Sequence, residues 1–372
     1  MDTSAASQPI RVEIPPLYCP FPYAIHPQHP EMEQRCLAWL SDLGVSQFEQ
    51  AKALLAIGNW AEGLACSYPL GARQAVQLVI DWAVFYAVVD DMFTELGPLG
   101  RDLARLAKHL SRMLRTLEVP NSGLAGDTPF EKAWQDIAQR CFDLAPPQVF
   151  RRWTQGHRTH FACVAWHQSF LSAGRLPSLN EYISLRGGAV GTAPSAAMVE
   201  LTRGCEVPSE EMDTPAGRVL HEAWAFLHGC DNDLASYGKE LWDTRHTHTT
   251  DATRSTPFNI VGLLMHERGC GLSEALDRVA ALRNQVMLLL VRLIERLRPR
   301  ASSAMRSYLA GVGPNIRGVL DWYLCPRTGR YTNPDGKSPG AVQYTFTISD
   351  TPPSTTEVPT DLPTMSWWWD HV

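Results

Sequence analysis

Apolar residues recur at three- and four-residue spacing along almost the whole middle of the chain, which is the pattern of amphipathic helices. The spacing occurs in residues 32–43, 72–95, 101–117, 129–144, 147–172, 179–204, 212–240, 257–268, 272–297 and 301–312. Proline and glycine mark most of the joints. No run of alternating β-branched residues bounded by hairpin turns interrupts the pattern. The sequence therefore predicts an all-α fold, a single large helical bundle.

The two ends of the chain lack this periodicity. Residues 1–15 mix serine, alanine and proline and are expected to form a flexible arm, so that the helical domain spans residues 16–335. Residues 336–372 are rich in proline, serine and threonine, which predicts a disordered tail. The run Trp367–Trp369 inside this tail is expected to remain unpacked.

Charge and cysteine content limit the classes of function. The 33 lysines and arginines against 39 acidic residues give a net charge of −6, so no basic stripe for nucleic acid is expected. The apolar stretches fall short of the ~20 residues that span a bilayer, which predicts no membrane span. Nine dispersed cysteines indicate reduced thiols, and the first residues lack the apolar core of a signal peptide. A cytoplasmic location is therefore expected.

Two of the predicted helices are apolar on nearly every face and yet end in acidic residues. They are residues 78–95, LVIDWAVFYAVVDDMFTE, and residues 223–240, AWAFLHGCDNDLASYGKE. A helix that is apolar all round lies in the centre of a bundle, where carboxylates are costly unless something neutralises them. Acidic side chains at the end of a helix that is predicted to be buried therefore indicate a functional site.

The first of these acidic ends contains three carboxylates. On a helix, Asp91 and Glu95 share one face and Asp90 lies at its flank. Carboxylate oxygens suit hard cations such as Mg²⁺. The alternative is a solvated helix end or a cap for the next helix.

The second acidic end has a more regular pattern. Asn232, Ser236 and Glu240 occur at i, i+4 and i+8 and so form one continuous stripe of side-chain oxygens. Asparagine and serine are poor residues for a helix interior, so helix propensity does not explain their spacing. The stripe predicts a site for a hard cation, with Lys239 beside it to reach a phosphate.

These residues carry a family resemblance. DDMFTE (90–95) and NDLASYGKE (232–240) resemble the two metal-binding motifs of bacterial class I terpene synthases. Arg330-Tyr331 looks like the C-terminal Arg-Tyr pair of that family, and YISLRGGAVGTAPSAAMVE (182–200) is similar to its R-R-x-T-x-G-x-x-P helix. Arg186 then matches the arginine that senses diphosphate. Gly187 and Ala189 depart from the pattern, but the small residues still predict a helix break at which Val190 or Gly191 points a carbonyl into a cavity.

The resemblance implies a fold, a reaction and a cofactor. The fold is a class I terpenoid synthase bundle, and the substrate is a linear isoprenyl diphosphate ionised with three Mg²⁺ ions, with Mn²⁺ as a substitute. Asp90, Asp91, Glu95, Asn232, Ser236 and Glu240 would hold metal, and Arg186, Lys239, Arg330 and Tyr331 would stabilise the departing diphosphate. Because diphosphate supplies most of the metal ligands, metal should bind weakly without it. Trp82, Tyr86, Phe226 and Trp322, with Val190 and Gly191, are expected to line the apolar substrate cavity.

The substrate and the alternatives stay open. Farnesyl diphosphate and a sesquiterpene product are expected because that substrate is the commonest for the architecture. A diterpene or methylated monoterpene synthase is an alternative within the family. A chain-elongating prenyltransferase would need a second aspartate-rich motif in place of the asparagine-serine-glutamate stripe. A catalytically silent isoprenoid-binding protein would tolerate lost metal ligands, and none is lost. A homodimer is possible.

Overall fold

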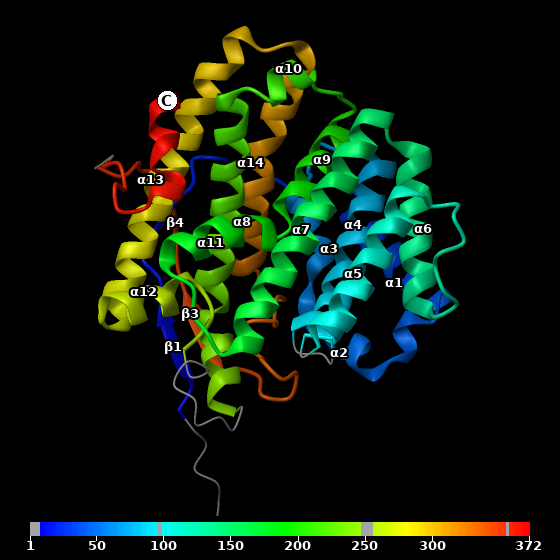
Figure 1. Ribbon diagram of the computed structural model, residues 1–372, viewed down its shortest axis with the longest axis horizontal. Coiled ribbons are helices and arrows are strands. Elements are labelled where there is room, and N and C mark those ends of the chain that lie inside the picture. The colour runs from blue at the N-terminus through cyan, green and yellow to red at the C-terminus, as the bar shows by residue number, and fades with distance from the viewer. Residues whose placement is uncertain (1–7, 96–98, 101, 247–255, 355–356) are drawn as a thin grey trace, which may run out of the picture.

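The computed structural model describes residues 8–95, 99–100, 102–246, 256–354 and 357–372, and most of them form helices packed side by side (Figure 1). The first half comprises α1 (His29–Asp42), α2 (Glu49–Gly58), α3 (Trp60–Ser67), α4 (Arg73–Val89), α5 (Leu103–Glu118), α6 (Pro129–Leu144) and α7 (Pro147–Ala173). The second half comprises α8 (Leu179–Ala189), α9 (Thr192–Arg203), α10 (Ser209–Met212), α11 (Pro215–His246), α12 (Ile260–Arg268), α13 (Leu272–Leu297), α14 (Ser303–Leu324) and α15 (Pro363–Ser366). The prediction of an all-α bundle is confirmed.

Local sequence explains where several helices begin. At α6 and α8 the residue before the helix is Thr128 or Ser178, whose hydroxyl accepts from the backbone three residues on. Glu131 and Glu181 return the bond to the cap backbone, which completes a capping box at each helix. Proline opens α7 at Pro147, as the predicted joint requires.

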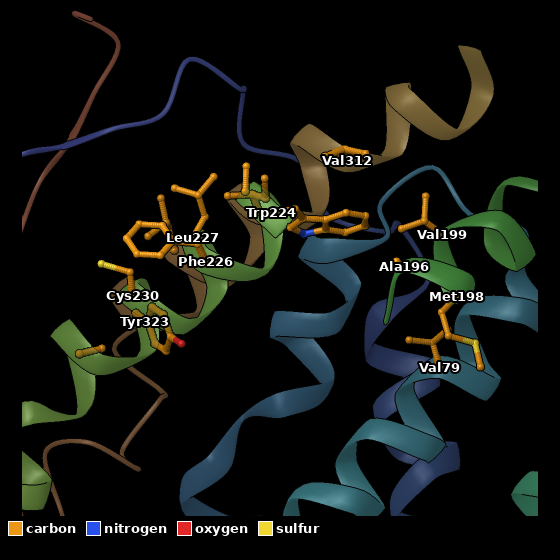
Figure 2. Close-up of a cluster of buried hydrophobic side chains, with 14 of the residues drawn as sticks. Val79, Ala196, Met198, Val199, Trp224, Phe226, Leu227, Cys230, Val312 and Tyr323 are labelled. Carbon is orange, nitrogen blue, oxygen red and sulfur yellow. The ribbon is translucent and has the colours of Figure 1, made fainter. Parts of the chain in front are cut away.

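The long helix α11 lies in the interior and organises the core. It packs against α13, α8, α14 and α9. Figure 2 shows its Trp224 directed toward Val199 of α9 and Val312 of α14, within a cluster of buried apolar side chains. The described helices include none that is both long and apolar enough to cross a bilayer.

The terminal segments differ from the expectation of free arms. Strand β1 (Ile10–Glu13) pairs in parallel with β3 (Val342–Thr345), and β2 (Leu17–Tyr18) pairs with β4 (Ile348–Ser349). β1 and β3 lie beside α11, and β2 lies beside α13 (Figure 1). At Gly238 of α11 a Cβ would lie 2.4 Å from Val342, so a glycine allows the close approach. The prediction of disorder from residue 336 was wrong for this stretch, because each strand is short and finds its partner over 300 residues away.

The tryptophan run is also packed, contrary to the sequence prediction. Trp368 is 3% exposed, and its indole N–H donates to Glu222 of α11 at 2.9 Å. Its ring meets Phe226 edge to face, with 6.1 Å between centroids. The end of the chain therefore covers the outer face of α11. Residues 1–7 and 355–356 lie outside the described residues.

Candidate active site

A cavity of about 1020 Å³ opens into the bundle between α3, α4, α7, the α8–α9 junction, α11 and α14. Most of the side chains that the sequence analysis selected contribute to its lining, although they come from distant parts of the chain. They are Trp82, Tyr86, Asp90, Arg186, Val190, Gly191, Asn232, Ser236, Lys239, Glu240, Trp322, Arg330 and Tyr331. The two acidic motifs therefore face one cavity.

The first motif does not continue α4 as a regular helix. Residues Asp90–Glu95 form a π-helix, η2, in which the hydrogen bonds run from i to i+5. The predicted sharing of one face by Asp91 and Glu95 stays a prediction, because it depends on the Glu95 side chain. Asp90 lines the cavity, whereas Asp91 is 3% exposed and is not among the lining residues. The side chain of Glu95 lies outside the described residues.

The second motif keeps its predicted geometry. Asn232, Ser236 and Glu240 lie on regular helix and all line the cavity. The Ser236 hydroxyl donates to Glu240 Oε1 at 2.6 Å, and the amide of Asn259 donates to Glu240 Oε2 at 2.7 Å. Asn259 also caps α12 by accepting from the backbone N–H of Gly262. The oxygen stripe is thus held in place by a neighbouring helix cap.

Arg186, at the end of α8, joins the stripe from the side. Its Nε donates to Asp233 Oδ1 at 2.8 Å and its Nη2 donates to Asn232 Oδ1 at 2.5 Å. Tyr182 and the backbone N–H of Ile260 donate to the other oxygen of Asp233. Burial opposes the charge on Arg186, but the Asp233 carboxylate raises the pKa of the guanidinium, which stays cationic. Sequence reasoning missed Asp233, although its place next to Asn232 was a usable signal.

The Arg-Tyr pair after α14 connects the two motifs. Arg330 donates to both oxygens of Asp91, with Nη2 to Oδ1 at 2.7 Å. Tyr331 accepts from the Asn232 amide through its hydroxyl at 3.0 Å. Burial raises the pKa of the Tyr331 phenol, so it remains protonated. The dipeptide Arg330-Tyr331 therefore contacts both acidic motifs, Asp91 in the first and Asn232 in the second.

The cavity lining contains both cations and carboxylates. Lys239 is buried, with its Nζ 3.4 Å from Asp243 Oδ2, and both residues line the cavity. Arg186 and Arg330 supply further positive charge on the same lining, which also includes Asp90 and Glu240. Such an arrangement suits an anion that binds together with metal ions.

The predicted helix break occurs between α8 and α9. Val190 ends α8, and Gly191 takes the left-handed conformation with φ 78°, which glycine adopts without strain. The Gly191 carbonyl accepts from the backbone and the hydroxyl of Ser195. Pro194 has no N–H, so the Val190 carbonyl lacks the regular i+4 donor.

Comparison with known proteins agrees with this geometry. Residues 81–287 match the model of terpene synthase family 2, C-terminal metal binding. This chain belongs to the class I terpene synthases. It is 30% identical to spiroviolene synthase of Streptomyces violens, over 97% of this chain and 98% of that protein. The crystal structure of SVS_A2, a protein from ancestral sequence reconstruction, shares 31% identity with a TM-score of 0.80, covering 96% of this chain and 98% of the other. Relatives include both a diterpene cyclase and a (2E,6E)-farnesyl diphosphate cyclizing enzyme.

One aromatic side chain expected in the synthase cavity points elsewhere. Trp82, Tyr86 and Trp322 line the cavity, but Phe226 is not among its lining residues. In Figure 2 it leaves α11 in the direction opposite to Trp224, toward the side where Trp368 packs. The reason is helical phase: Phe226 lies two positions before His228, which lines the cavity, and two positions turn a helix by about 200°.

Three buried histidines of the synthase cavity were missed by sequence reasoning. His157 and His160 on α7 and His228 on α11 all line it. Burial lowers the pKa of His157 to about 3 and the pKa values of His160 and His228 to about 4, so all three are neutral near pH 7. In the sequence, their only signal was a position on the inner face of an apolar helix. Histidines in ordinary protein cores occupy the same kind of position, so this signal does not identify a cavity residue.

The donor set fits a divalent metal that arrives with an anion. Among the described residues, no group of three His, Cys, Asp or Glu side chains is close enough to hold an ion alone. The α11 stripe supplies an amide, a hydroxyl and a carboxylate, and Asp90 faces the same cavity. Oxygen donors of this kind suit Mg²⁺ or Mn²⁺ when substrate phosphates complete the coordination.

Proposed function

We propose that this synthase ionises a linear isoprenyl diphosphate in the presence of Mg²⁺, cyclises the resulting carbocation and releases diphosphate. The supporting observation is that Asp90 and the stripe Asn232, Ser236 and Glu240 line the same cavity as Arg186 and the other cations. A prenyltransferase is disfavoured because Asn232, Ser236 and Glu240 replace the second aspartate-rich motif that it would need.

The polar residues divide into two roles. Asp90, Asp91 and Glu95 on one side, and Asn232, Ser236 and Glu240 on the other, would hold three Mg²⁺ ions, or Mn²⁺ in their place. When bound, the metal supplies positive charge that stabilises the leaving diphosphate. Arg186, Lys239, Arg330 and the Tyr331 hydroxyl bind the same anion and orient it, so that negative charge develops next to fixed cations and donors.

The apolar lining protects the cation once the diphosphate has left. Trp82, Tyr86 and Trp322 present aromatic faces to the cavity, each worth roughly 0.5–2 kcal/mol to a nearby cation. Aromatic and aliphatic walls also exclude water, which would otherwise quench the intermediate. The Val190 carbonyl at the helix break lacks its regular helical donor and would offer a dipole to the cation.

The cavity volume favours a longer chain than the sequence alone suggested. Small-molecule sites typically enclose about 300–1,000 Å³, and this cavity of about 1020 Å³ lies at the upper limit. Small residues on the α4 face, Ala83 and Ala87, widen it next to Tyr86. We therefore propose the twenty-carbon geranylgeranyl diphosphate as the first candidate. The fifteen-carbon farnesyl diphosphate, expected from the sequence, is the second, and a methylated ten-carbon substrate is the third.

A direct assay separates these possibilities. Purified protein is incubated with Mg²⁺ and the ten-, fifteen- or twenty-carbon diphosphate, and the organic extract is analysed by gas chromatography with mass spectrometry while released diphosphate is measured. A cyclic hydrocarbon or alcohol from one substrate supports the proposal. A longer linear diphosphate would identify an elongating enzyme, and no release from any substrate would identify a silent binding protein.

Two matched variants sharpen the substrate assignment. Ala87→Phe should shorten the cavity and lower turnover of the twenty-carbon substrate more than turnover of the fifteen-carbon one. Ala56→Phe, on the exposed side of α2, should leave turnover of both substrates unchanged. Equal loss with both substrates would contradict the proposed dependence on cavity length.

Location and assembly remain proposals as well. All nine cysteines fall in the described residues and none forms a disulfide, which supports a reducing, cytoplasmic environment. A homodimer is proposed on the resemblance alone, and sedimentation velocity tests it.

A further inference from the structure

The cavity histidines differ in what their ring nitrogens meet. His157 Nε2 accepts from the indole N–H of Trp82 at 3.1 Å, while its Nδ1 donates to the Trp153 carbonyl. His228 Nε2 accepts from the indole N–H of Trp224 at 3.2 Å, so its Nδ1 carries the hydrogen and donates to the Thr192 hydroxyl at 3.3 Å. An indole N–H donates a hydrogen bond but does not give up its proton near neutral pH. Neither of these histidines can therefore take a proton through its partner.

His160 is paired with a phenol instead. Its Nδ1 lies 3.0 Å from the carbonyl oxygen of Gly188, which can only accept, so Nδ1 carries the hydrogen. Its Nε2 is then a lone pair, and the hydroxyl of Tyr86, 2.7 Å away, must donate to it. A phenol, unlike an indole, can pass its hydrogen on and accept another at the same oxygen.

The ring of Tyr86 is fixed by its aromatic neighbours. The Tyr86 ring stacks on Phe161, with 6.3 Å between centroids, and contacts Trp134 at 6.1 Å. Tyr86 and His160 both line the cavity. Because the hydrogen of Tyr86 is directed to His160, the remaining lone pairs of its oxygen are directed away from the imidazole. Tyr86 lies one helical turn before Asp90, about 6 Å deeper along α4.

We propose that Tyr86 and His160 form the proton acceptor that ends the cyclisation, an inference that rests on the proposed function. Tyr86 is the catalytic group that contacts the cation, and His160 acts through it. The class of step is loss of a carbon-bound proton from a carbocation to give an alkene.

The step balances without any additional reactant. The C–H bond next to the cationic carbon breaks, and its electron pair forms the new C=C bond. The proton goes to Tyr86 Oη while the hydrogen of that hydroxyl moves to His160 Nε2. His160 becomes an imidazolium that donates to both Tyr86 and the Gly188 carbonyl, and it returns its proton to solvent by the reverse path after product release.

The electrostatic setting is compatible with this relay. Burial raises the pKa of Tyr86, and Asp90 adds to the effect, so the phenol does not ionise by itself and the two transfers occur together. Burial lowers the pKa of His160, with Arg186 contributing, so the imidazole is neutral before the reaction. A carbocation is so strong an acid that even this weak base accepts its proton, and position decides which base acts.

The molecule contains a chemically identical group away from the cavity. His221 Nδ1 lies 2.8 Å from the Gly217 carbonyl, and its Nε2 lies 2.7 Å from the hydroxyl of Tyr308. Neither His221 nor Tyr308 lines the cavity. The same deletions at this second Tyr–His–carbonyl group therefore measure the structural cost without touching the proposed relay.

The test compares products at constant ionisation. Tyr86→Phe keeps the ring and removes the relay oxygen. His160→Gln preserves a donor for Gly188 and an acceptor for Tyr86 but cannot take a proton. Tyr308→Phe and His221→Gln are the controls. Each variant is assayed for diphosphate release and for product distribution, with circular dichroism as the folding check.

The expected result is a change of product without a comparable loss of ionisation. In both cavity variants the share of the wild-type major alkene should fall at least about tenfold, with isomers or alcohols in its place, while diphosphate release stays within a few-fold. Both controls should keep the wild-type distribution. An unchanged distribution in Tyr86→Phe, or loss of diphosphate release in it, would overturn the inference, as would a wild-type product that is only an alcohol. If Tyr86→Phe does not fold, the product distribution of His160→Gln alone tests the inference.

Absence of diphosphate release from the wild type would instead refute the proposed function.

Discussion

The two walls that carry the acidic motifs hold their polar groups in different ways. On α11 the stripe lies on regular helix, and its members contact Arg186, Tyr331 and Asn259. At the end of α4 the chain changes to π-helix, and Asp91 is bound by Arg330 from the C-terminal part of the chain. The α11 stripe is therefore aligned by its own helix and fixed by partners from α8, the start of α12 and the segment after α14, whereas Asp91 is fixed by a residue about 240 positions away.

This difference shows which parts of the site are preorganised. An i, i+4, i+8 stripe on a buried helix needs only the helix to bring its oxygens into line. At the end of α4, Asp90 lines the cavity, whereas its neighbour Asp91 is bound by Arg330. We expect substitutions in the α11 stripe to reduce turnover more than substitutions of Asp90 or Asp91 at the end of α4.

The largest effect is expected on the α11 wall. Asn232→Ala or Glu240→Gln should reduce turnover about 10³-fold or more, because each removes a metal-facing oxygen from a fixed stripe. Circular dichroism should remain helical in both. Glu222→Gln, on the outer face of the same helix, is the matched control and should keep near-full turnover. Near-full turnover in both site variants would mean that the stripe does not bind metal.

A smaller loss is expected on the α4 wall. Asp90→Asn should lower turnover roughly 10- to 100-fold and raise the Mg²⁺ concentration needed for half-maximal rate, because other ligands partly compensate. Asp91→Asn should weaken the link to Arg330 and shift the Mg²⁺ requirement less. Steady-state assays over a Mg²⁺ titration measure both. If Asp91→Asn shifts the requirement more than Asp90→Asn, the assignment of faces is incorrect.

The neutral histidines predict a stability that falls with acid. Folded-state pKa values of about 4 for His160 and His228 lie below the ordinary 6.5, so the unfolded chain binds more protons between these values. Stability is therefore complete above about pH 6.5 and is lost as the pH falls, by about 2 kcal/mol for each such histidine at pH 5. Thermal melts at pH 7.5 and 5.0 should show this loss, and His160→Gln should show less of it. Equal losses in both proteins would contradict the prediction.

The smallest effect is expected on the outer face of α11. Trp368→Phe removes the indole bond to Glu222 and should cost about 1 kcal/mol of unfolding free energy. Turnover should change less than twofold, because the cavity lies on the other side of the helix. Urea unfolding and the product assay measure the two quantities. A product change in this variant would show that the C-terminal residues reach the site.

Much of the site was predictable because its signals are local. The regular spacing of Asn232, Ser236 and Glu240 is a property of nine consecutive residues, and the small residues before Pro194 indicate the break at Gly191 in the same way. Asp233 and the cavity histidines were missed because polar residues on the inner face of a helix are equally common in ordinary cores. Phe226 was misassigned because composition was considered without helical phase.

The sequence by itself determined the helices, their caps and the oxygen stripe, since each follows from side chains within a few turns of one another. Only the tertiary structure decided that Arg330 binds Asp91, that β1 pairs with β3, and that Trp368 covers α11. Those contacts join residues hundreds of positions apart, and their partners are selected by the packing of the whole bundle. The hydrogen bond between the phenol of Tyr86 on α4 and the imidazole of His160 on α7 likewise depends on tertiary packing, because the two residues are 74 positions apart.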